Sequence, residues 1–352
     1  MYYLNKNIKD LNRVFDQHER KGYLRLDLNE NPTGLPQSFI DKVLKDVDSD
    51  FISQYPETLE FTETLANYLE TDIEHINLVN GSSEGIRNII EAYTSEGGKI
   101  LGVTPSYAMF EVYSKMYGRN FVPIEYTDDL KINIEDVLNA MTKDIQLLIV
   151  VNPNNPVGNA FTNEEIEKII KKAKENEITI LIDEAYYYFY DNTFIKYALE
   201  NEHIFLTRTF SKLFSLAGCR LGYVVGWPDG IKMIQKLCTP HNVNAFGMKF
   251  AKAVIDEPNM IETLVSKHKD GREYLINFLN VNGYEFSALN GNFMFIKPKS
   301  DPNILVDKMK NEKGILIKTY SGIGKLGNCL RVTTGERSAM IKFIEALNEL
   351  DK

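Results

Sequence analysis

Short apolar runs alternate with amphipathic stretches from about residue 76 to residue 226. The runs are INLV, KILGV, IQLLIVV, ITILID, HIFLTR and LGYVVG, and most are rich in β-branched residues. Between them lie stretches with helical spacing, such as TNEEIEKIIKKAKEN, where Thr162 and Glu165 form a capping-box pattern. This alternation is typical of a mostly parallel sheet with helices on both faces. The sequence therefore predicts an α/β fold with a large, mostly parallel sheet flanked by helices.

The pattern changes near residue 240. Two helical stretches are separated at Pro258, and the later runs YEFSAL, NFMFIK, GILIKTY and NCLRVTTG indicate strands interleaved with helices. This part is expected to be a smaller α+β domain. The polar first segment ends in a turn cluster at Pro32, Gly34 and Pro36. We therefore expect an N-terminal arm at 1–35 that packs with the small domain, a large domain at 36–245 and a small domain at 246–352.

Composition narrows the class of protein. The chain has 352 residues, 43% of them hydrophobic and 25% charged, which suits a large and a small globular domain. The net charge of −9 argues against a nucleic-acid partner, and no apolar run is long enough to span a membrane. The N-terminus lacks a basic start followed by an apolar block, and Cys219, Cys238 and Cys329 form no CxxC pair. We therefore expect a cytoplasmic protein. The histidines lack metal-site spacing, so no metal is expected.

Ligands bind open parallel sheets at the carboxyl ends of the strands, so the residues after each apolar run are the first candidates. In VNGSSEGI, Ser82 and Ser83 begin a helix whose free N–H groups favour an anion, although a plain capped turn explains them too. Tyr107 in TPSYAMF could stack on a flat ring or simply pack in the core. Two Asn-Pro steps in NPNNPVG hold Asn155 rigidly, either as an amide donor or as part of a turn.

Two further strand ends carry ionisable groups. Asp183 ends an apolar strand in LIDEAYYYF, where an unpaired carboxylate is costly, and Tyr186 follows three residues later. The alternative is that Asp183 caps a helix. Ser211, Lys212 and Arg220 follow the run IFLTR. Lysine forms Schiff bases and its pKa falls beside another cation, whereas a single lysine is more often a solvated surface residue.

Taken together, these residue types match one kind of ligand, an aromatic aldehyde that carries a phosphate. Such a cofactor needs a lysine for its imine, a carboxylate for its pyridinium nitrogen, donors for its phenolate oxygen, an aromatic stacking partner and an anion cradle. Asn155, Asp183 and Lys212 are separated by about one strand–helix unit each. The remaining alternative is a ligand-binding or regulatory protein without catalytic activity, in which these residues stand at the strand ends by coincidence.

The motifs, in this order, resemble a known family. NENPTG, YPE, GSSEGI, PSYAMF, NPNNPVG, DEAY, TFSK, AGCRLGY and LRVTTG are similar to those of the fold-type I, class I/II pyridoxal-phosphate aminotransferases. Within them the chain most resembles the histidinol-phosphate aminotransferase branch, from about Leu26 to the C-terminal helix. The resemblance implies pyridoxal 5'-phosphate as the cofactor and the type I fold of these transferases.

The resemblance also implies a role for each matching residue. Lys212 would form the aldimine with the cofactor and then move the proton at the substrate carbon. Asp183 would hold the pyridine nitrogen protonated, Tyr186 and Asn155 would bond the phenolate oxygen, and Tyr107 would stack on the ring. The residues implied to bind the cofactor phosphate are Ser82, Ser83, Thr209, Ser211 and Arg220.

The implied substrate contacts come from the arm and the small domain. Asn29 lies in the arm that closes over the substrate, and Arg331 of LRVTTG matches the arginine that grips its acidic group. Lys318 stands where the branch often has a second arginine, so it is expected to contact the substrate as a point charge. Tyr55 of YPE looks like the residue that reaches the neighbouring subunit's phosphate, which implies a homodimer with shared active sites.

The resemblance favours a ping-pong transamination between histidinol phosphate and 2-oxoglutarate, giving imidazole acetol phosphate and glutamate. Its partners are then a small-molecule amino donor and a 2-oxo acid. Two alternatives within the same cofactor class stay open. One is an aminotransferase for aromatic or other amino donors, and the other is a decarboxylase of threonine phosphate or serine phosphate.

Overall fold

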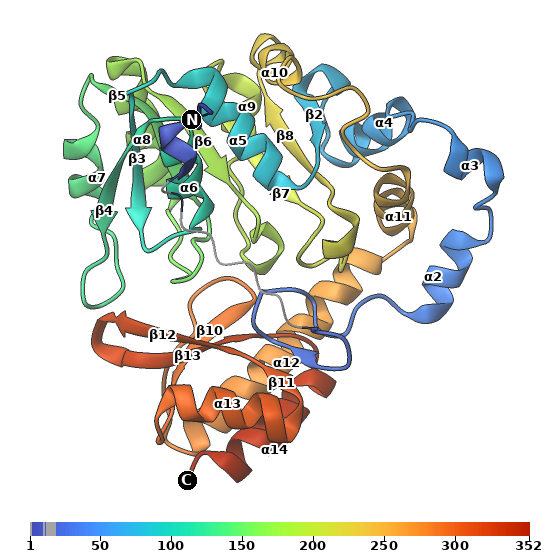
Figure 1. The fold of residues 1–352 in the computed structure, drawn as a ribbon, viewed down its shortest axis with the longest axis vertical. Helices are drawn as coiled ribbons and strands as arrows, with labels where there is room; N and C mark the ends of the chain where they lie inside the picture. Colours follow the sequence, from blue (N-terminus) through green and yellow to red (C-terminus); the bar gives the residue numbers. More distant parts are fainter. Residues whose placement is uncertain (1, 10, 12–18) are drawn as a thin grey trace.

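The computed structural model describes residues 2–9, 11 and 19–352, so part of the predicted arm (1, 10 and 12–18) lies outside the described residues. Figure 1 shows the large sheet and the helices around it in the upper part of the view and a smaller α+β body in the lower part. The loops at the lower end of the large sheet face the small body. Within the described ranges, no helix is both long and apolar enough to cross a membrane.

The large sheet has seven strands, and only one of them runs against the rest. Their order is β2 (Ile76–Val79), β8 (Gly222–Gly226), β7 (Ile204–Thr209), β6 (Thr179–Asp183), β5 (Ile145–Val151), β3 (Lys99–Thr104) and β4 (Asn120–Glu125). Strand β8 is antiparallel to both neighbours, and the other pairs are parallel. The predicted α/β class with a mostly parallel sheet is confirmed. Edge strand β4 was not predicted, because it carries Pro123 and is only partly buried.

Helices cover both faces of this sheet. Buried side chains of α5 (Ser82–Tyr93), α6 (Met109–Met116) and α10 (Pro228–Gln235) pack on one face. The other face is covered by α4 (Leu59–Tyr68), α7 (Ile134–Ala140), α8 (Asn163–Asn176), α9 (Ile195–Glu200) and α11 (Ala245–Asp256). Both bonds of the predicted capping box at Thr162 and Glu165 are present at the start of α8. Helices α2 (Gln37–Leu44) and α3 (Ser49–Ser53) connect the arm to α4.

The small body is built on an antiparallel sheet in the order β12 (Lys318–Ile323), β13 (Gly327–Thr333), β10 (Phe293–Lys297) and β9 (Glu285–Ser287). Its core also takes in α12 (Met260–Val281), α13 (Pro302–Lys313) and α14 (Arg337–Leu350). Strand β1 (Leu24–Arg25) pairs in parallel with β11 (Ile315–Leu316), whereas α1 (Lys6–Lys9) lies near α6. The domain boundaries at 35 and 245 stay predictions.

Candidate active site

A cavity of about 490 Å³ lies where the parallel strands of the large sheet end. Its walls combine the residues after β3, β5, β6 and β7 with the arm and with β12 and β13. The predicted site residues that line it are Asn29, Ser82, Ser83, Tyr107, Asn155, Asp183, Tyr186, Thr209, Ser211, Lys212, Arg220, Lys318 and Arg331. Tyr55 is the predicted residue that lies elsewhere.

Asp183 is held at the end of β6 by two hydrogen bonds to one of its oxygens. Thr207 Oγ1 on β7 donates to Asp183 Oδ1 at 3.2 Å, and Ala185 N donates to the same oxygen at 3.1 Å. The second contact is a local turn bond, and Asp183 does not cap a helix, because the 3-10 turn that follows (Tyr187–Phe189) has Tyr186 at its N-cap position. Burial raises the pKa of Asp183 to about 6, against the effect of the Thr207 bond. The carboxylate is therefore costly to keep ionised unless a cation or N–H group meets it.

Lys212 follows β7 and points its amine toward the arm. Its Nζ donates to Leu28 O at 3.1 Å and lies 5.6 Å from the centre of the Tyr186 ring. Burial, followed by the charges of Arg331 and Arg220, lowers the pKa of Lys212 to about 8. An appreciable fraction of this amine is therefore neutral near pH 7, which is the form that attacks an aldehyde.

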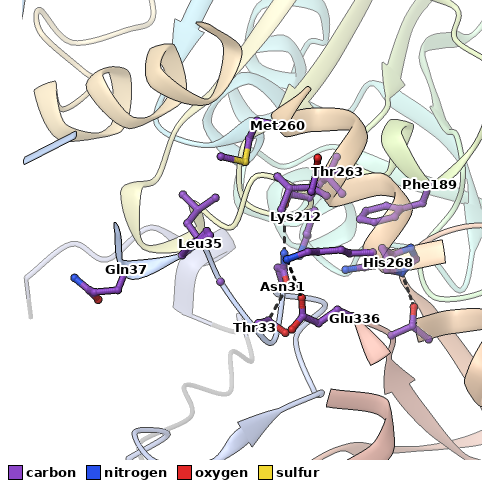
Figure 2. A pocket seen from close by; sticks show the side chains of 18 residues that line it. Asn31, Thr33, Leu35, Gln37, Phe189, Lys212, Met260, Thr263, His268 and Glu336 are labelled. Carbon is purple, nitrogen blue, oxygen red and sulfur yellow. Dashed lines mark hydrogen bonds and ion pairs between the residues drawn. The ribbon is translucent and has the colours of Figure 1, made fainter. Parts of the chain in front are cut away.

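A second cavity, of about 350 Å³, borders Lys212 as well (Figure 2). It lies between the segment 31–37, α12 and the junction of β13 with α14. Phe189 and His268 form part of its wall, with ring centres 4.6 Å apart, and His268 Nε2 lies 2.7 Å from Thr334 Oγ1. Lys212 thus stands between two cavities.

The N-terminus of α5 forms an anion cradle with Arg220. Gly81 precedes the helix with φ of 72°, and within the described residues no side chain caps this N-terminus. A Cβ atom on Gly81 would collide with the Arg220 guanidinium, and one on Gly222 would lie 2.6 Å from Ser82 N. Arg220 Nη1 donates to Ser211 Oγ at 3.3 Å, and Thr209 Oγ1 donates to Ser211 Oγ at 2.9 Å. Glycines here let the Arg220 guanidinium and the first amides of α5 lie close together, so that a cation, N–H groups and hydroxyls are available to one phosphate.

Gly81→Ala tests this cradle. The added methyl group must displace the Arg220 guanidinium, and the residue must keep a backbone conformation that favours glycine. We expect the dissociation constant for pyridoxal phosphate, measured by fluorescence titration of the apo protein, to rise about tenfold or more. Gly97→Ala is the control, because Gly97 also has a positive φ but its Cβ position is open. Equal affinities for the two variants would contradict the cradle.

An asparagine from the arm links the other polar groups. Asn29 Nδ2 donates to Tyr186 Oη at 2.9 Å and lies 3.3 Å from Asn155 Oδ1. Asn29 is 1% exposed and has φ of 57°, and Thr333 Oγ1 donates to its Oδ1 at 3.2 Å. Tyr107 Oη lies 3.1 Å from Ser83 Oγ at the opposite wall. The arm residue therefore contacts the predicted phenolate donors directly, besides its predicted place beside the substrate.

Two cations from the small sheet face the cavity. Lys318 and Arg331 are register partners on β12 and β13. Arg331 Nη1 donates to Asn155 Oδ1 at 3.1 Å and to Tyr320 Oη at 3.3 Å, and Arg331 Nη2 donates to Asp27 O at 2.5 Å. The Nε atom of Arg331 is buried without a hydrogen-bond partner in the described part of the chain. This end of the cavity suits an anionic group.

Thr207 and Tyr320 are polar contacts that the sequence analysis missed. Thr207 is the register partner of Asp183, and the signal for it is the polar end TRT of a strand that begins with the apolar run IFL. Tyr320 also lines the cavity and bonds Arg331. Its position depends on the pairing of β12 with β13, which the apolar pattern does not specify.

Tyr55 lies on the surface between α3 and α4. It is 78% exposed and stacks on His241 with ring centres 4.6 Å apart. Exposed apolar side chains surround this region, among them Ile52, Leu59 and Phe246. Tyr55 therefore does not line the cavity of its own chain.

The residues of the first cavity fit pyridoxal phosphate: a cradle that a Cβ would fill, a buried carboxylate and a lysine with a lowered pKa. Residues 21–347 match the family described as aminotransferase class I and II. The chain belongs to this family and is a pyridoxal-phosphate-dependent aminotransferase.

Several relatives of this chain are named histidinol-phosphate aminotransferase. A histidinol-phosphate aminotransferase of Caldanaerobacter subterraneus subsp. tengcongensis is 31% identical over 93% of this chain and 92% of its own. The crystal structure of the histidinol-phosphate aminotransferase from Clostridium acetobutylicum is 27% identical, with a TM-score of 0.81 over 93% of this chain and 99% of that one. The Sinorhizobium meliloti enzyme in complex with pyridoxal-5'-phosphate is 22% identical and shares the fold, with a TM-score of 0.88 over 99% and 98%.

Proposed function

We propose that this aminotransferase uses histidinol phosphate as its amino donor and 2-oxoglutarate as its acceptor. The observation that carries the proposal is the pair of cations, Lys318 and Arg331, side by side on β12 and β13 at the cavity. They suit a phosphate in one half-reaction and a carboxylate in the other. The names of relatives that match over nine tenths of the chain support the same donor.

The proposed roles follow from the geometry. When bound, pyridoxal phosphate supplies an electron sink for removal of the proton on the amino-bearing carbon of the substrate. Asp183 would place a negative charge beside the ring nitrogen and hold a proton on it. Tyr107 would stack on the ring, and the α5 N-terminus with Arg220 would hold the phosphate.

Lys212 is the proposed general base and acid. Its lowered pKa lets the amine take a proton from the substrate carbon and return it to a neighbouring atom without a large driving force. Tyr186 and Asn155 would donate to the phenolate oxygen, and Asn29 would orient both side chains through its bonds from the arm.

Lys318→Ala tests the phosphate contact. Loss of a charge-assisted bond is expected to raise the KM for histidinol phosphate about tenfold or more, with kcat nearly unchanged. Lys318→Arg should keep a low KM, because the guanidinium offers a fork where lysine offers a point charge. The measurement is a coupled assay with histidinol phosphate and with histidinol. An equal rise in KM for both donors would contradict a phosphate contact.

We further propose a homodimer in which Tyr55 completes the partner subunit's phosphate site. The support is its exposure on a surface rich in apolar side chains, outside its own cavity. Mixing Lys212→Ala subunits with Tyr55→Ala subunits should form hybrids in which one site has both residues. A statistical mixture is then expected to regain about a quarter of the wild-type activity. No recovery, with hybrids demonstrated by native mass spectrometry, would contradict the shared site.

A further inference from the structure

The residues that follow Asp183 and Thr207 form an ion pair away from the cavity. Asp183 and Thr207 are register partners at the ends of β6 and β7, and Glu184 N donates to Thr207 O at 2.9 Å. Glu184 directly follows β6, and Arg208 is the next residue of β7. Successive side chains on a strand point to opposite faces, so Arg208 points away from Thr207. The residues that line the ligand cavity include Asp183 but neither Glu184 nor Arg208.

Both members of this ion pair are almost fully buried, and both carboxylate oxygens of Glu184 accept hydrogen bonds. Arg208 Nε and Nη2 donate to Glu184 Oε2 at 3.0 and 2.8 Å, and the two side chains are 4% and 0% exposed. Phe194 N donates to Glu184 Oε1 at 2.7 Å, and Thr193 Oγ1 donates to Oε2 at 2.8 Å. The Arg208 guanidinium also lies 3.7 Å from the centre of the Tyr187 ring.

The bond from Phe194 N to Glu184 Oε1 joins the two ends of the segment 184–194, which carries Tyr186. Within it, Tyr187 packs on Arg208, and Phe189 packs on His268 at the wall of the second cavity (Figure 2). The segment is thus fixed on one side by the ion pair and on the other by α12.

A gain in stability does not account for such a pair. Removing two charges from water costs several kcal/mol per ion, and apolar side chains of the same size are often as stable or more so. What the pair adds is geometry, because a bidentate fork and two further bonds fix one orientation of the strand end.

We propose that Glu184 and Arg208 are positioning residues, which clamp the ends of β6 and β7 so that Asp183 and Tyr186 meet the cofactor ring correctly. The clamp goes beyond the proposed function and does not depend on which amino donor the enzyme uses. Its effect is therefore read first as affinity for pyridoxal phosphate and only then as turnover.

The test is the double variant Glu184→Gln with Arg208→Met, which removes both charges and leaves neither buried alone. We expect a Tm close to that of the wild type. The dissociation constant for pyridoxal phosphate should rise about tenfold, the visible circular dichroism of the bound cofactor should change, and kcat should fall about 10- to 100-fold with little change in KM. The matched control is Lys99→Met with Asp144→Asn, an exposed pair at the other end of the sheet, which should alter none of these.

If the double variant does not fold, Thr193→Val tests the clamp instead, because it removes only the hydroxyl that bonds both Glu184 and Arg208. It should weaken cofactor binding a few-fold at an almost unchanged Tm. Wild-type cofactor affinity and dichroism in the folded double variant, or in Thr193→Val, would overturn the clamp. A wrong amino donor would leave these two readouts as they are, so the two failures can be told apart.

Discussion

Lys212→Ala is expected to lower kcat by at least about 10⁴-fold, because the variant lacks both the amine that bonds the cofactor and the base that moves the proton. The rest of the cavity stays in place. The α5 N-terminus and Arg220 would still hold the phosphate, and Asp183 would still be available to the ring nitrogen, because the other residues that line the cavity are unchanged. We therefore expect pyridoxal phosphate to bind the variant without a covalent bond, at an affinity reduced by far less than kcat.

Two measurements check this expectation. Borohydride reduction followed by mass spectrometry should attach the cofactor to the wild type at residue 212 and leave the variant unlabelled. Added methylamine should restore part of the proton transfer in Lys212→Ala, because a free amine fits the space that the side chain leaves. Lys115→Ala is a control from the same large body, outside the cavity. A labelled Lys212→Ala protein would show that another lysine forms the bond.

Asp183→Asn is expected to change activity and stability in opposite directions. An amide cannot hold a proton on the ring nitrogen, so kcat should fall by about 10³-fold, as when a preorganised charge is removed from an active site. The bonds from Thr207 and Ala185 can persist, since the asparagine oxygen also accepts them. The loss is therefore one of charge and not of position.

The apo protein should become more stable with the same substitution. Burial raises the pKa of Asp183 to about 6, so the folded state binds a proton that the unfolded chain has already released. This group contributes stability at low pH that is lost as the pH rises from about 4 through about 6. At pH 8 the ionised carboxylate costs on the order of 3 kcal/mol, which Asp183→Asn removes.

Thermal unfolding of the two apo proteins at pH 8 and pH 4 tests the sign. The Tm of Asp183→Asn should exceed that of the wild type at pH 8, and the difference should shrink or vanish at pH 4. With cofactor bound the gain at pH 8 should be lost, because the ring nitrogen then meets the carboxylate. A variant less stable than the wild type at pH 8 in the apo form would contradict the cost of keeping this buried carboxylate ionised.

The apolar pattern predicted the large sheet because its central strands are buried on both faces and read as continuous apolar runs. Strands β5 and β6 are of this kind, and β7 begins with the apolar run IFL. Edge strand β4 and the two-residue strand β1 were not predicted, whereas the predicted run GILIKTY is divided between β11 and β12. Strand β4 is half-exposed, and β1 is too short to show a period.

The strand-end rule also brought most candidate residues to one place, because parallel strands deliver their carboxyl ends to the same edge. This rule could not predict contacts between segments that are far apart in the sequence. Asn29 and Thr333 are 304 residues apart and bond each other, and Glu184 meets Arg208 through strand register. Local sequence preferences do not specify which strands pair, so contacts between residues on different strands are known only from the folded sheet.

The half-reaction with a single amino donor tests the central claim most directly. The cofactor-loaded enzyme is mixed with histidinol phosphate, phenylalanine, aspartate or O-phosphothreonine, without a 2-oxo acid, and the cofactor absorbance is followed. We expect histidinol phosphate to convert the cofactor to its amino form at least about 100-fold faster per unit concentration than the other donors. Slow, similar rates for all donors, or release of carbon dioxide from O-phosphothreonine, would contradict the account.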